Sequence, residues 1–456
     1  MFKKVLIANR GEIAVRIIRA CRELGIHTVT VYSTADKHAL HAKIADEAVC
    51  IGPAATKDSY LNAAAIIEAC KMTGAEAVHP GFGFLSENAD FAELCLKNNI
   101  VFIGPRPESI RMLGDKAAAK ETMKAAGVPV IPGSDGAVPD MEAAKKLCKE
   151  IGCPLMVKAS AGGGGRGIRL VEHPEDLEAA ITAAKQEALN FFGNDEVYME
   201  KFIVNPKHIE VQILADSYGN TVYLGERDCS MQRRNQKVLE EAPSPASFMN
   251  EELRAKMGKA ACTAAKVCGY RNAGTIEFLV DKNGEFYFME MNTRIQVEHP
   301  ITEVVTGVDL VKQQLLIASG QRLSIKQEDI KLTGHAIECR INAENPLLDF
   351  RPSPGRIKSL FIPGGPGIRV DTAVYQGYEI PPYYDSMIGK LIVHGKNREE
   401  AIAKMTWALS EFIVDGVATN VDFQLKLIRR PEFLEGNYDN GFLNRTDILA
   451  DERSKE

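Results

Sequence analysis

The sequence has 456 residues, of which 45% are hydrophobic and 25% are charged. This is the composition of an average soluble globular protein, which excludes a disordered chain, a collagen and a coiled-coil rod, and the length predicts more than one domain. Asp and Glu total 61 against 55 for Lys and Arg, which argues against a general nucleic-acid binder. No apolar run is long enough for a membrane span.

The ten cysteines are scattered along the chain and form no CxxC pair. In a chain of this length they are typical of reduced, mostly buried thiols in a cytoplasmic protein, not of a zinc site or a disulfide framework. The first residues carry charge but no long apolar stretch follows them, so we expect no secretory signal.

The first 114 residues alternate between strand and helix patterns, which predicts βαβ units and a doubly wound parallel sheet. A helix with Ile13, Ile17 and Ile18 on one face follows the first strand. The predicted strands are 5–8, 29–32, 77–78 and 101–103, and further helices are predicted near 63–69 and 89–96.

Two glycine-containing segments, 9–12 and 79–84, lie where predicted strands end. Ligands of parallel sheets bind beyond the carboxyl ends of the strands, so both segments are candidate ligand contacts. Neither is a dinucleotide fingerprint, because Gly11 stands alone and Ser86 takes the place of a third glycine.

The middle stretch, 115–330, holds most of the polar candidate site residues, and the first motif in it is a glycine loop. Five glycines surround Arg166 between an apolar strand ending in Lys158 and a second strand at 168–171. Glycines let backbone N–H groups converge on an anion, and the two cations add fixed positive charge. The chain has no GK[ST] sequence, so this is not a P-loop. We expect a hairpin flap that folds over a nucleotide.

Two glutamates are predicted to share one face of a hairpin at 275–292. If Val280 pairs with Glu285, Glu277 lies opposite Phe288 and Glu290 is its diagonal neighbour, with Asn292 on the same face. Such an oxygen-only set is the kind that Mg²⁺ or Mn²⁺ prefers when bound to phosphates. The alternative is a half-exposed hairpin with ordinary glutamates.

The segment 293–300 alternates polar and apolar residues and is predicted to be a strand. Arg294, Gln296 and Glu298 would then share a face, with an arginine to grip a small oxyanion and a glutamate to take its proton. His299 precedes a proline, and we interpret it as structural.

Residues 201–203 and 207–213 are interpreted as one more alternating strand, with His208, Glu210 and Gln212 on one face. His208 is a candidate nucleotide contact, although a lone histidine is more often a local hydrogen-bonding residue. Taken alone, the polar segment 227–237 is typical of a solvated surface loop.

Together these segments resemble the ATP-grasp superfamily and, within it, the biotin carboxylase family. The resemblance implies an α/β N-terminal domain at 1–114, an ATP-grasp domain with a glycine flap at 115–330, a mixed α+β domain at 331–446, and a polar tail at 447–456. The resembling segments are 8–14, 79–88, 114–116, the glycine loop, 226–234, 290–300 and 350–355.

The resemblance also implies the reaction. ATP phosphorylates bicarbonate to carboxyphosphate with Mg²⁺ or Mn²⁺ (two ions), and the carboxyl group then moves to biotin N1′. The chain has no Ala-Met-Lys-Met run, so we expect biotin on a separate biotin carboxyl carrier protein and not attached to this chain. Carboxyltransferase subunits and a second copy of the chain, as a homodimer, are the other implied partners, with no nucleic acid and no membrane.

The resemblance also implies roles for residues of this chain that stand at positions matching the family's motifs. The implied ATP-binding residues are Lys116, Lys158, Gly164, Gly165, Glu200, Lys201, Ile203, His208, Asn235, Glu277 and Glu290. The implied metal ligands are Glu277, Glu290 and Asn292. The implied bicarbonate contacts are Lys237, Arg294, Gln296, Val297 and Glu298. The implied catalytic residues are Arg294, Glu298, Lys237 and Arg340, and biotin is assigned to Arg340 and Phe82.

Two positions depart from the family pattern. Phe82 stands where many relatives have Tyr, and Asn235 where many have His, which puts one hydroxyl contact and one ribose contact in doubt. Neither change removes an implied metal, phosphate or bicarbonate contact.

Other interpretations stay open from the sequence. Another ATP-grasp ligase, such as a purine-pathway carboxylase or a carbamoyl-phosphate-type enzyme, would turn over without biotin. A non-catalytic regulatory or scaffold protein is opposed by the intact Glu277, Glu290, Asn292, Arg294 and Glu298. Acetyl-CoA (in fatty acid biosynthesis), pyruvate and other acyl-CoA acceptors are equally compatible, because that choice lies in the partner transferase.

Overall fold

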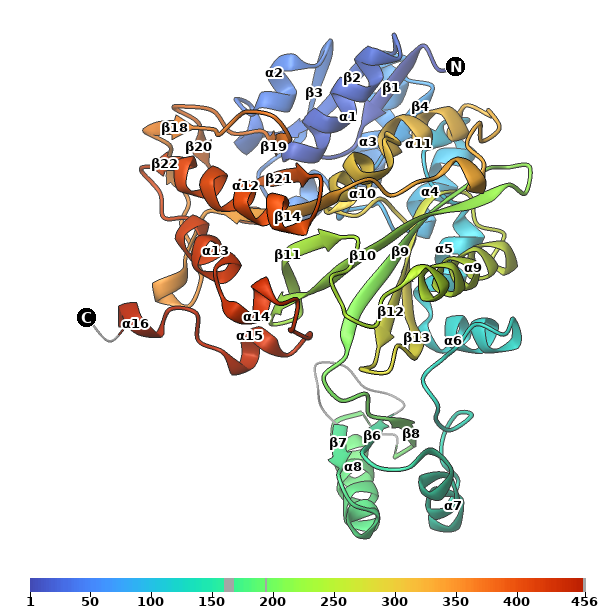
Figure 1. Ribbon diagram of the computed structural model, residues 1–456. Coiled ribbons are helices and arrows are strands. Elements are labelled where there is room, and N and C mark those ends of the chain that lie inside the picture. The colour runs from blue at the N-terminus through green and yellow to red at the C-terminus, as the bar shows by residue number, and fades with distance from the viewer. Residues whose placement is uncertain (160–167, 193–194, 454–456) are drawn as a thin grey trace.

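The computed structural model describes residues 1–159, 168–192 and 195–453 (Figure 1). Its N-terminal part is a five-stranded sheet with the order β3-β2-β1-β4-β5. Every strand pair in it is parallel, which confirms the predicted parallel-sheet domain. The strands are β1 (Lys4–Ile7), β2 (His27–Ser33), β3 (Glu47–Gly52), β4 (Ala77–His79) and β5 (Val101–Phe102), and the helices are α1 (Gly11–Glu23), α2 (Leu40–Ile44), α3 (Ala63–Thr73), α4 (Ala89–Lys97) and α5 (Pro107–Gly114).

The apolar runs of the sequence form the core of this sheet. Val5, Leu6 and Ile7 of β1 are fully buried, and Ile13 and Ile17 of α1 pack beside them. The edge strand β3 is the strand of this sheet that the sequence prediction missed, as it also missed the helices α2 and α5. Only the Ile51 side chain of β3 is buried, so its apolar signal is weak.

The central sheet has eight strands in the order β13-β12-β9-β10-β11-β14-β21-β19. Because β11 pairs with β14, strands from the predicted middle and last stretches share one continuous sheet. Its strands are β9 (Lys207–Ala215), β10 (Thr221–Arg233), β11 (Gln236–Ala242), β12 (Asn272–Val280), β13 (Phe286–Asn292), β14 (His335–Asn342), β19 (Ile368–Thr372) and β21 (Met387–Gly395).

A smaller unit, which we call the lid, lies at the bottom of Figure 1 below the central sheet. Its three-stranded sheet, β7-β6-β8, packs with two helices around its own hydrophobic core. The predicted strands on either side of the glycine loop are confirmed, whereas Gly164 and Gly165 lie outside the described residues. The lid elements are β6 (Leu155–Ala159), β7 (Ile168–Val171), β8 (Val197–Lys201), α7 (Met141–Ile151) and α8 (Leu177–Phe192).

The remaining elements surround the central sheet. The helices are α6 (Lys116–Ala125), α9 (Glu251–Val267), α10 (His299–Thr306), α11 (Leu310–Ala318), α12 (Arg398–Glu411), α13 (Val421–Ile428), α14 (Pro431–Leu434), α15 (Phe442–Arg445) and α16 (Ala450–Arg453). The short strands are β15 (Glu344–Asn345), β16 (Arg351–Pro352), β17 (Gly355–Arg356), β18 (Ser359–Phe361), β20 (Glu379–Ile380) and β22 (Ile413–Asp415). Among the described helices, none has both the length and the apolar character to cross a membrane.

Two local predictions about these elements were wrong. Residues 227–237 are not a surface loop but the β10–β11 hairpin, joined by a two-residue turn in which Arg234 and Asn235 have φ of 50° and 63°. Residues 201–213 are not one strand, because β8 belongs to the lid and β9 to the central sheet. Within the predicted polar tail, Leu449 packs into the C-terminal core, and α16 follows it.

Candidate active site

The largest collection of predicted site residues surrounds a cavity of about 990 Å³. Its walls come from the loops after β1 and β4, from the central sheet, and from residues 383–385 before β21. The structure therefore brings together segments that are far apart in the sequence. The predicted residues that line the cavity are Phe82, Lys116, His208, Asn235, Lys237, Glu277, Glu290, Asn292, Arg294, Gln296, Val297 and Arg340.

The β12–β13 hairpin places the two predicted metal-binding glutamates face to face. Glu277 pairs directly with Glu290, not with Phe288, because a bulge at Met289 shifts the register. The predicted diagonal arrangement was therefore wrong, although both carboxylates do lie on one face. Asn292 Nδ2 donates to Glu277 Oε1 at 2.8 Å, and Lys116 Nζ lies 2.8 Å from Glu290 Oε2. Two carboxylates and an amide oxygen are a donor set that fits Mg²⁺ or Mn²⁺.

Lys237 is the cation at the centre of the site. Its ammonium lies 2.6 Å from Glu210, 2.9 Å from Glu277 and 2.8 Å from Glu298. Burial alone would lower the pKa of Lys237, but the surrounding acidic groups raise it well above its ordinary value. The lysine is therefore charged at neutral pH, and it neutralises carboxylates that would otherwise repel one another.

Arg340 holds the opposite side of Glu298. Its guanidinium lies 3.0 Å from Glu298 Oε2 and 2.6 Å from Glu240 Oε1. Burial would raise the pKa of Glu298, but Lys237, Arg340 and the buried Arg227 lower it well below its ordinary value. Glu298 is thus an ionised carboxylate, able to accept a proton, between two cations.

Residues 293–298 are a loop, not the predicted strand. The strand β13 ends at Asn292, where the Glu87 carboxylate accepts hydrogen bonds from the Thr293 N–H and Arg294 Nε at 3.0 Å each. Arg294 also donates to Gln296 Oε1 at 2.7 Å. The polar side chains still converge on the cavity, but loop geometry brings them there and not the alternation of a strand.

The predicted nucleotide contacts of the lid do not line the cavity. Lys158 and Glu200 form an ion pair across β6 and β8, and Lys120 lies 3.8 Å from Glu200. Lys201 ends β8, and Ile203 lies in the loop after it. These residues form a second group, on the lid.

Sequence reasoning missed four charged or polar partners of the site: Glu87, Glu210, Gln232 and Glu240. Glu210 was detectable, because it lies two residues after His208 on the same strand face. Gln232 contacts the His208 ring at 3.0 Å, and His208 lies 3.0 Å from Glu277. Glu240 carried no signal, because its role depends on the pairing of β11 with β14.

Three family models match the chain in sequence. They are the biotin carboxylase N-terminal domain at residues 1–110, the carbamoyl-phosphate synthase L chain ATP-binding domain at 115–326, and the biotin carboxylase C-terminal domain at 338–445. The chain is 59% identical over 451 residues to biotin carboxylase 1 of Bacillus subtilis (strain 168), covering 99% of this chain and 100% of the relative. It is 56% identical over 440 residues to the chloroplastic biotin carboxylase of Arabidopsis thaliana, covering 96% and 82%.

Solved structures agree with the sequence relatives. A biotin carboxylase–nucleotide complex from Campylobacter jejuni has a TM-score of 0.88 at 53% identity, covering 98% of this chain and 99% of that one. A bicarbonate-bound biotin carboxylase domain of a thermophilic 2-oxoglutarate carboxylase has a TM-score of 0.92 at 51% identity, covering 97% and 98%. The fold, the carboxylate–cation cavity and these matches agree, and the chain belongs to the biotin carboxylase family of ATP-grasp ligases, which carboxylate biotin at the expense of ATP.

Proposed function

We propose that this chain carboxylates biotin on a separate carrier protein, as the first half-reaction of acetyl-CoA carboxylase or of a related complex such as a two-subunit pyruvate carboxylase. The observation that carries the proposal is the position of Glu298 between Lys237 and Arg340, beside the Glu277–Glu290 pair. A base between two cations suits a small anion that must lose a proton, and the paired carboxylates suit a metal–nucleotide.

In the first step bicarbonate binds against Arg294, Gln296, Val297 and Lys237, and Glu298 accepts its proton. The freed oxygen attacks the γ-phosphorus of ATP, the bond to the β-phosphate oxygen breaks, and ADP leaves with carboxyphosphate as the other product. Lys116 and Lys237 offset the negative charge on the phosphates. A divalent ion held by Glu277, Glu290 and Asn292 supplies further charge neutralisation at those phosphates.

In the second step the C–O bond of carboxyphosphate breaks and gives CO₂ and phosphate. Biotin N1′ loses its proton to that phosphate and forms the new N–C bond. Arg340 is placed to hold the ureido oxygen of biotin while it carries negative charge, with Phe82 against the ring. A dry site protects carboxyphosphate from hydrolysis, and we assign that task to the lid with Gly164 and Gly165.

The nucleotide is assigned to both groups of residues. His208 and Asn235 of the central sheet face the ribose, and Lys158, Glu200, Lys201 and Ile203 of the lid contact the phosphates and adenine. We propose the domain bounds expected from the sequence, 1–114, 115–330 and 331–446. We further propose a cytoplasmic homodimer that works with a biotin carboxyl carrier protein and carboxyltransferase subunits.

The test is ADP release from Mg-ATP with bicarbonate, measured with and without free biotin. We expect strong stimulation by biotin that disappears when bicarbonate is removed. Bicarbonate-dependent ATP cleavage that is indifferent both to free biotin and to a biotinylated carrier would point to another acceptor and contradict the proposal.

A further inference from the structure

Two buried side chains bind the backbone of the loop that precedes α10. His299 Nδ1 lies 2.8 Å from the Gln296 carbonyl oxygen, and Lys390 Nζ donates to the Val297 carbonyl oxygen at 2.9 Å. Neither side chain lines the cavity, whereas Gln296 and Val297 do. The two consecutive carbonyls of this segment are therefore held from the side that faces away from the site.

Because a peptide is planar, holding its carbonyl also fixes the direction of its N–H group. In a trans peptide the C=O of one residue and the N–H of the next point in opposite directions. With the Gln296 carbonyl held by His299, the Val297 N–H points the other way, and no described residue accepts a hydrogen bond from it. It is a free backbone donor beside Arg294 and Gln296.

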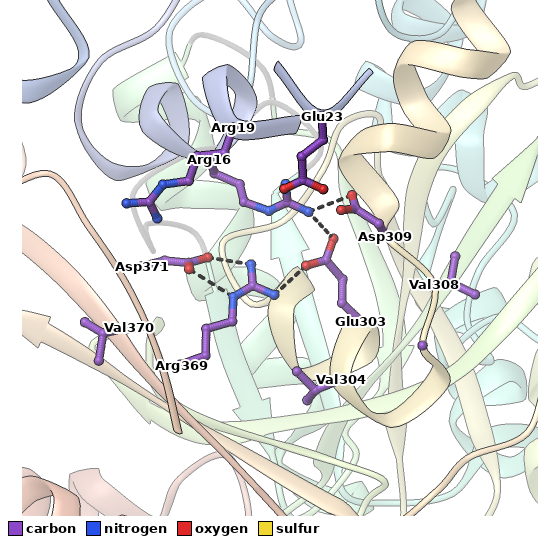
Figure 2. Close-up of a pocket in the computed structure, with 11 residues that line it drawn as sticks. Arg16, Arg19, Glu23, Glu303, Val304, Val308, Asp309, Arg369, Val370 and Asp371 are labelled. Atoms are coloured by element: carbon purple, nitrogen blue, oxygen red, sulfur yellow. Dashed lines mark hydrogen bonds and ion pairs between the residues drawn. The ribbon is translucent and has the colours of Figure 1, made fainter. Parts of the chain in front are cut away.

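Lys390, on β21, is held in place by a buried set of charges. Its side chain is fully buried, with its ammonium 3.1 Å from Glu12 and 4.0 Å from Asp371. Burying an ammonium is costly unless it is paired and hydrogen-bonded. Figure 2 shows the next layer: Arg369 bridges Asp371 and Glu303, and Arg16 donates to Glu303.

His299 is neutral and has one orientation. Burial, followed by the charges of Lys390, Arg16 and Arg369, lowers the pKa of His299 well below its ordinary value. Because the Gln296 carbonyl can only accept, the ring proton is on Nδ1. Its Nε2 has no hydrogen-bond partner among the described residues and lies 4.0 Å from Glu303.

We propose that His299 and Lys390 are positioning residues for the bicarbonate site. His299, through the Gln296 carbonyl, orients the Val297 N–H as an anion donor, and Lys390, through the Val297 carbonyl, holds the peptide that leads into Glu298 at the start of α10. The inference rests on the proposed function, in which Val297 is already a bicarbonate contact. It adds the residues that orient the backbone of that contact. A purely structural role predicts instead a loss of stability with no selective effect on bicarbonate.

The first test compares Glu12→Gln/Lys390→Met with Glu12→Gln alone. Both variants lose the Glu12 charge, so replacing Lys390 in the double variant does not leave an unpaired carboxylate at position 12. The double variant alone also loses the hydrogen bond from Lys390 to the Val297 carbonyl oxygen. Losing the hydrogen bond that fixes the Val297–Glu298 peptide is expected to raise the KM for bicarbonate about tenfold or more, with the KM for ATP within about twofold. Equal changes in both KM values, or no difference between the two variants, would overturn the proposal.

The second test keeps the inference falsifiable if the lysine variant does not fold. In His299→Asn the amide nitrogen takes the place of Nδ1 and keeps the donor, whereas His299→Leu has a similar size and no donor. We expect the bicarbonate KM to rise in His299→Leu and to stay near that of the parent chain in His299→Asn. Matching KM values in these two variants would contradict a positioning role.

The parent chain separates this inference from the proposed function. If the parent shows no bicarbonate- and biotin-dependent ADP release, the proposed function fails, and the inference fails with it. If the parent is active and the variants keep its bicarbonate KM, only the positioning role fails.

Discussion

At the scale of single residues, the site is defined by carboxylates whose charge is set by their neighbours. Glu298 lies between Lys237 and Arg340 and is ionised, whereas burial raises the pKa of the nearby Glu240 to about 7 against the opposing charge of Arg340. The Glu298 carboxylate, in the loop before α10, is thus ionised at neutral pH, whereas the Glu240 carboxyl on β11 is partly protonated. This difference separates a group that can accept a proton from one that holds Arg340 in place.

We expect Glu298→Gln to lower bicarbonate-dependent ADP release about 100- to 10,000-fold, the usual contribution of a general base. The KM for ATP is expected to stay within about twofold, because Glu298 contacts Lys237 and Arg340 and not the Glu277–Glu290 pair. Steady-state kinetics checks both values, with the exposed Glu68→Gln as control. Near-normal turnover in Glu298→Gln would show that another group takes the proton.

Glu338 gives a pH prediction. Burial, with Glu240 and Glu298 nearby, raises the pKa of Glu338 well above its ordinary value near 4.5. The folded state then holds a proton that the unfolded state releases, so this group destabilises the fold as pH rises above 4.5. Glu338→Gln removes this effect. The difference in free energy of unfolding, variant minus parent, should therefore rise by up to about 1.4 kcal/mol per pH unit between pH 5 and 7.

Denaturant unfolding of both chains at several pH values measures that difference. Glu328→Gln, a change at an exposed glutamate, is the control and should keep a constant offset from the parent across the range. A constant offset in Glu338→Gln as well would mean that the buried carboxyl does not hold its proton.

At the scale of elements, the β12–β13 hairpin shows what sequence patterns can and cannot predict. Alternation was enough to place Glu277 and Glu290 on one face, because two paired strands share a period of two. It did not predict the bulge at Met289, which changes which residues pair without changing the chemistry of the face. The shared face of the two glutamates was therefore predicted correctly from a register that was wrong.

Replacing one carboxylate of this hairpin should weaken the metal site selectively. Glu290→Gln is expected to raise the Mg²⁺ concentration for half-maximal activity at least about tenfold, because the amide loses a charge at the ion. The matched control is Glu285→Gln, an exposed residue at the start of the same returning strand. Equal Mg²⁺ requirements in the two variants would remove Glu290 from the metal site.

Two other elements were mispredicted because their polar residues are buried. Arg227 is fully buried and lies 2.5 Å from Glu210, so the polar sequence at 227–237 forms a hairpin that is buried at its base and exposed only near its tip. Residues 293–298 alternate like a strand, but Glu87, more than 200 positions earlier, binds the backbone where β13 ends. Such pairings are set by tertiary contacts, which local patterns do not contain.

At the scale of the whole molecule, the predicted stretches are not independent layers. The central sheet continues from β11 into β14, and buried ion pairs join α1, α10 and β19 through Arg16, Glu303 and Arg369 (Figure 2). Helix α10 follows Glu298 directly. The site is therefore supported by contacts that cross the expected domain boundary near residue 330.

Arg369→Met should lower the free energy of unfolding by about 2 kcal/mol, because Glu303 and Asp371 lose a shared cation in a largely buried setting. Arg369→Met/Asp371→Asn should recover part of the loss, since one unpaired charge is removed. The fluorescence of Trp407, the one tryptophan of the chain, reports the transition in denaturant. A single variant as stable as the parent would mean that these pairs are energetically neutral.

The β10–β11 turn also bears on which sequences can evolve at the nucleotide site. Asn235 lies in the left-handed region, where asparagine and histidine are enriched and β-branched residues are strained. An exchange between Asn and His at this position therefore changes the side chain of the proposed ribose contact without disturbing the backbone. Laboratory evolution of nucleotide preference at position 235 should accordingly recover Asn, His, Asp and Gly, and discard Val, Ile and Thr before selection acts on binding.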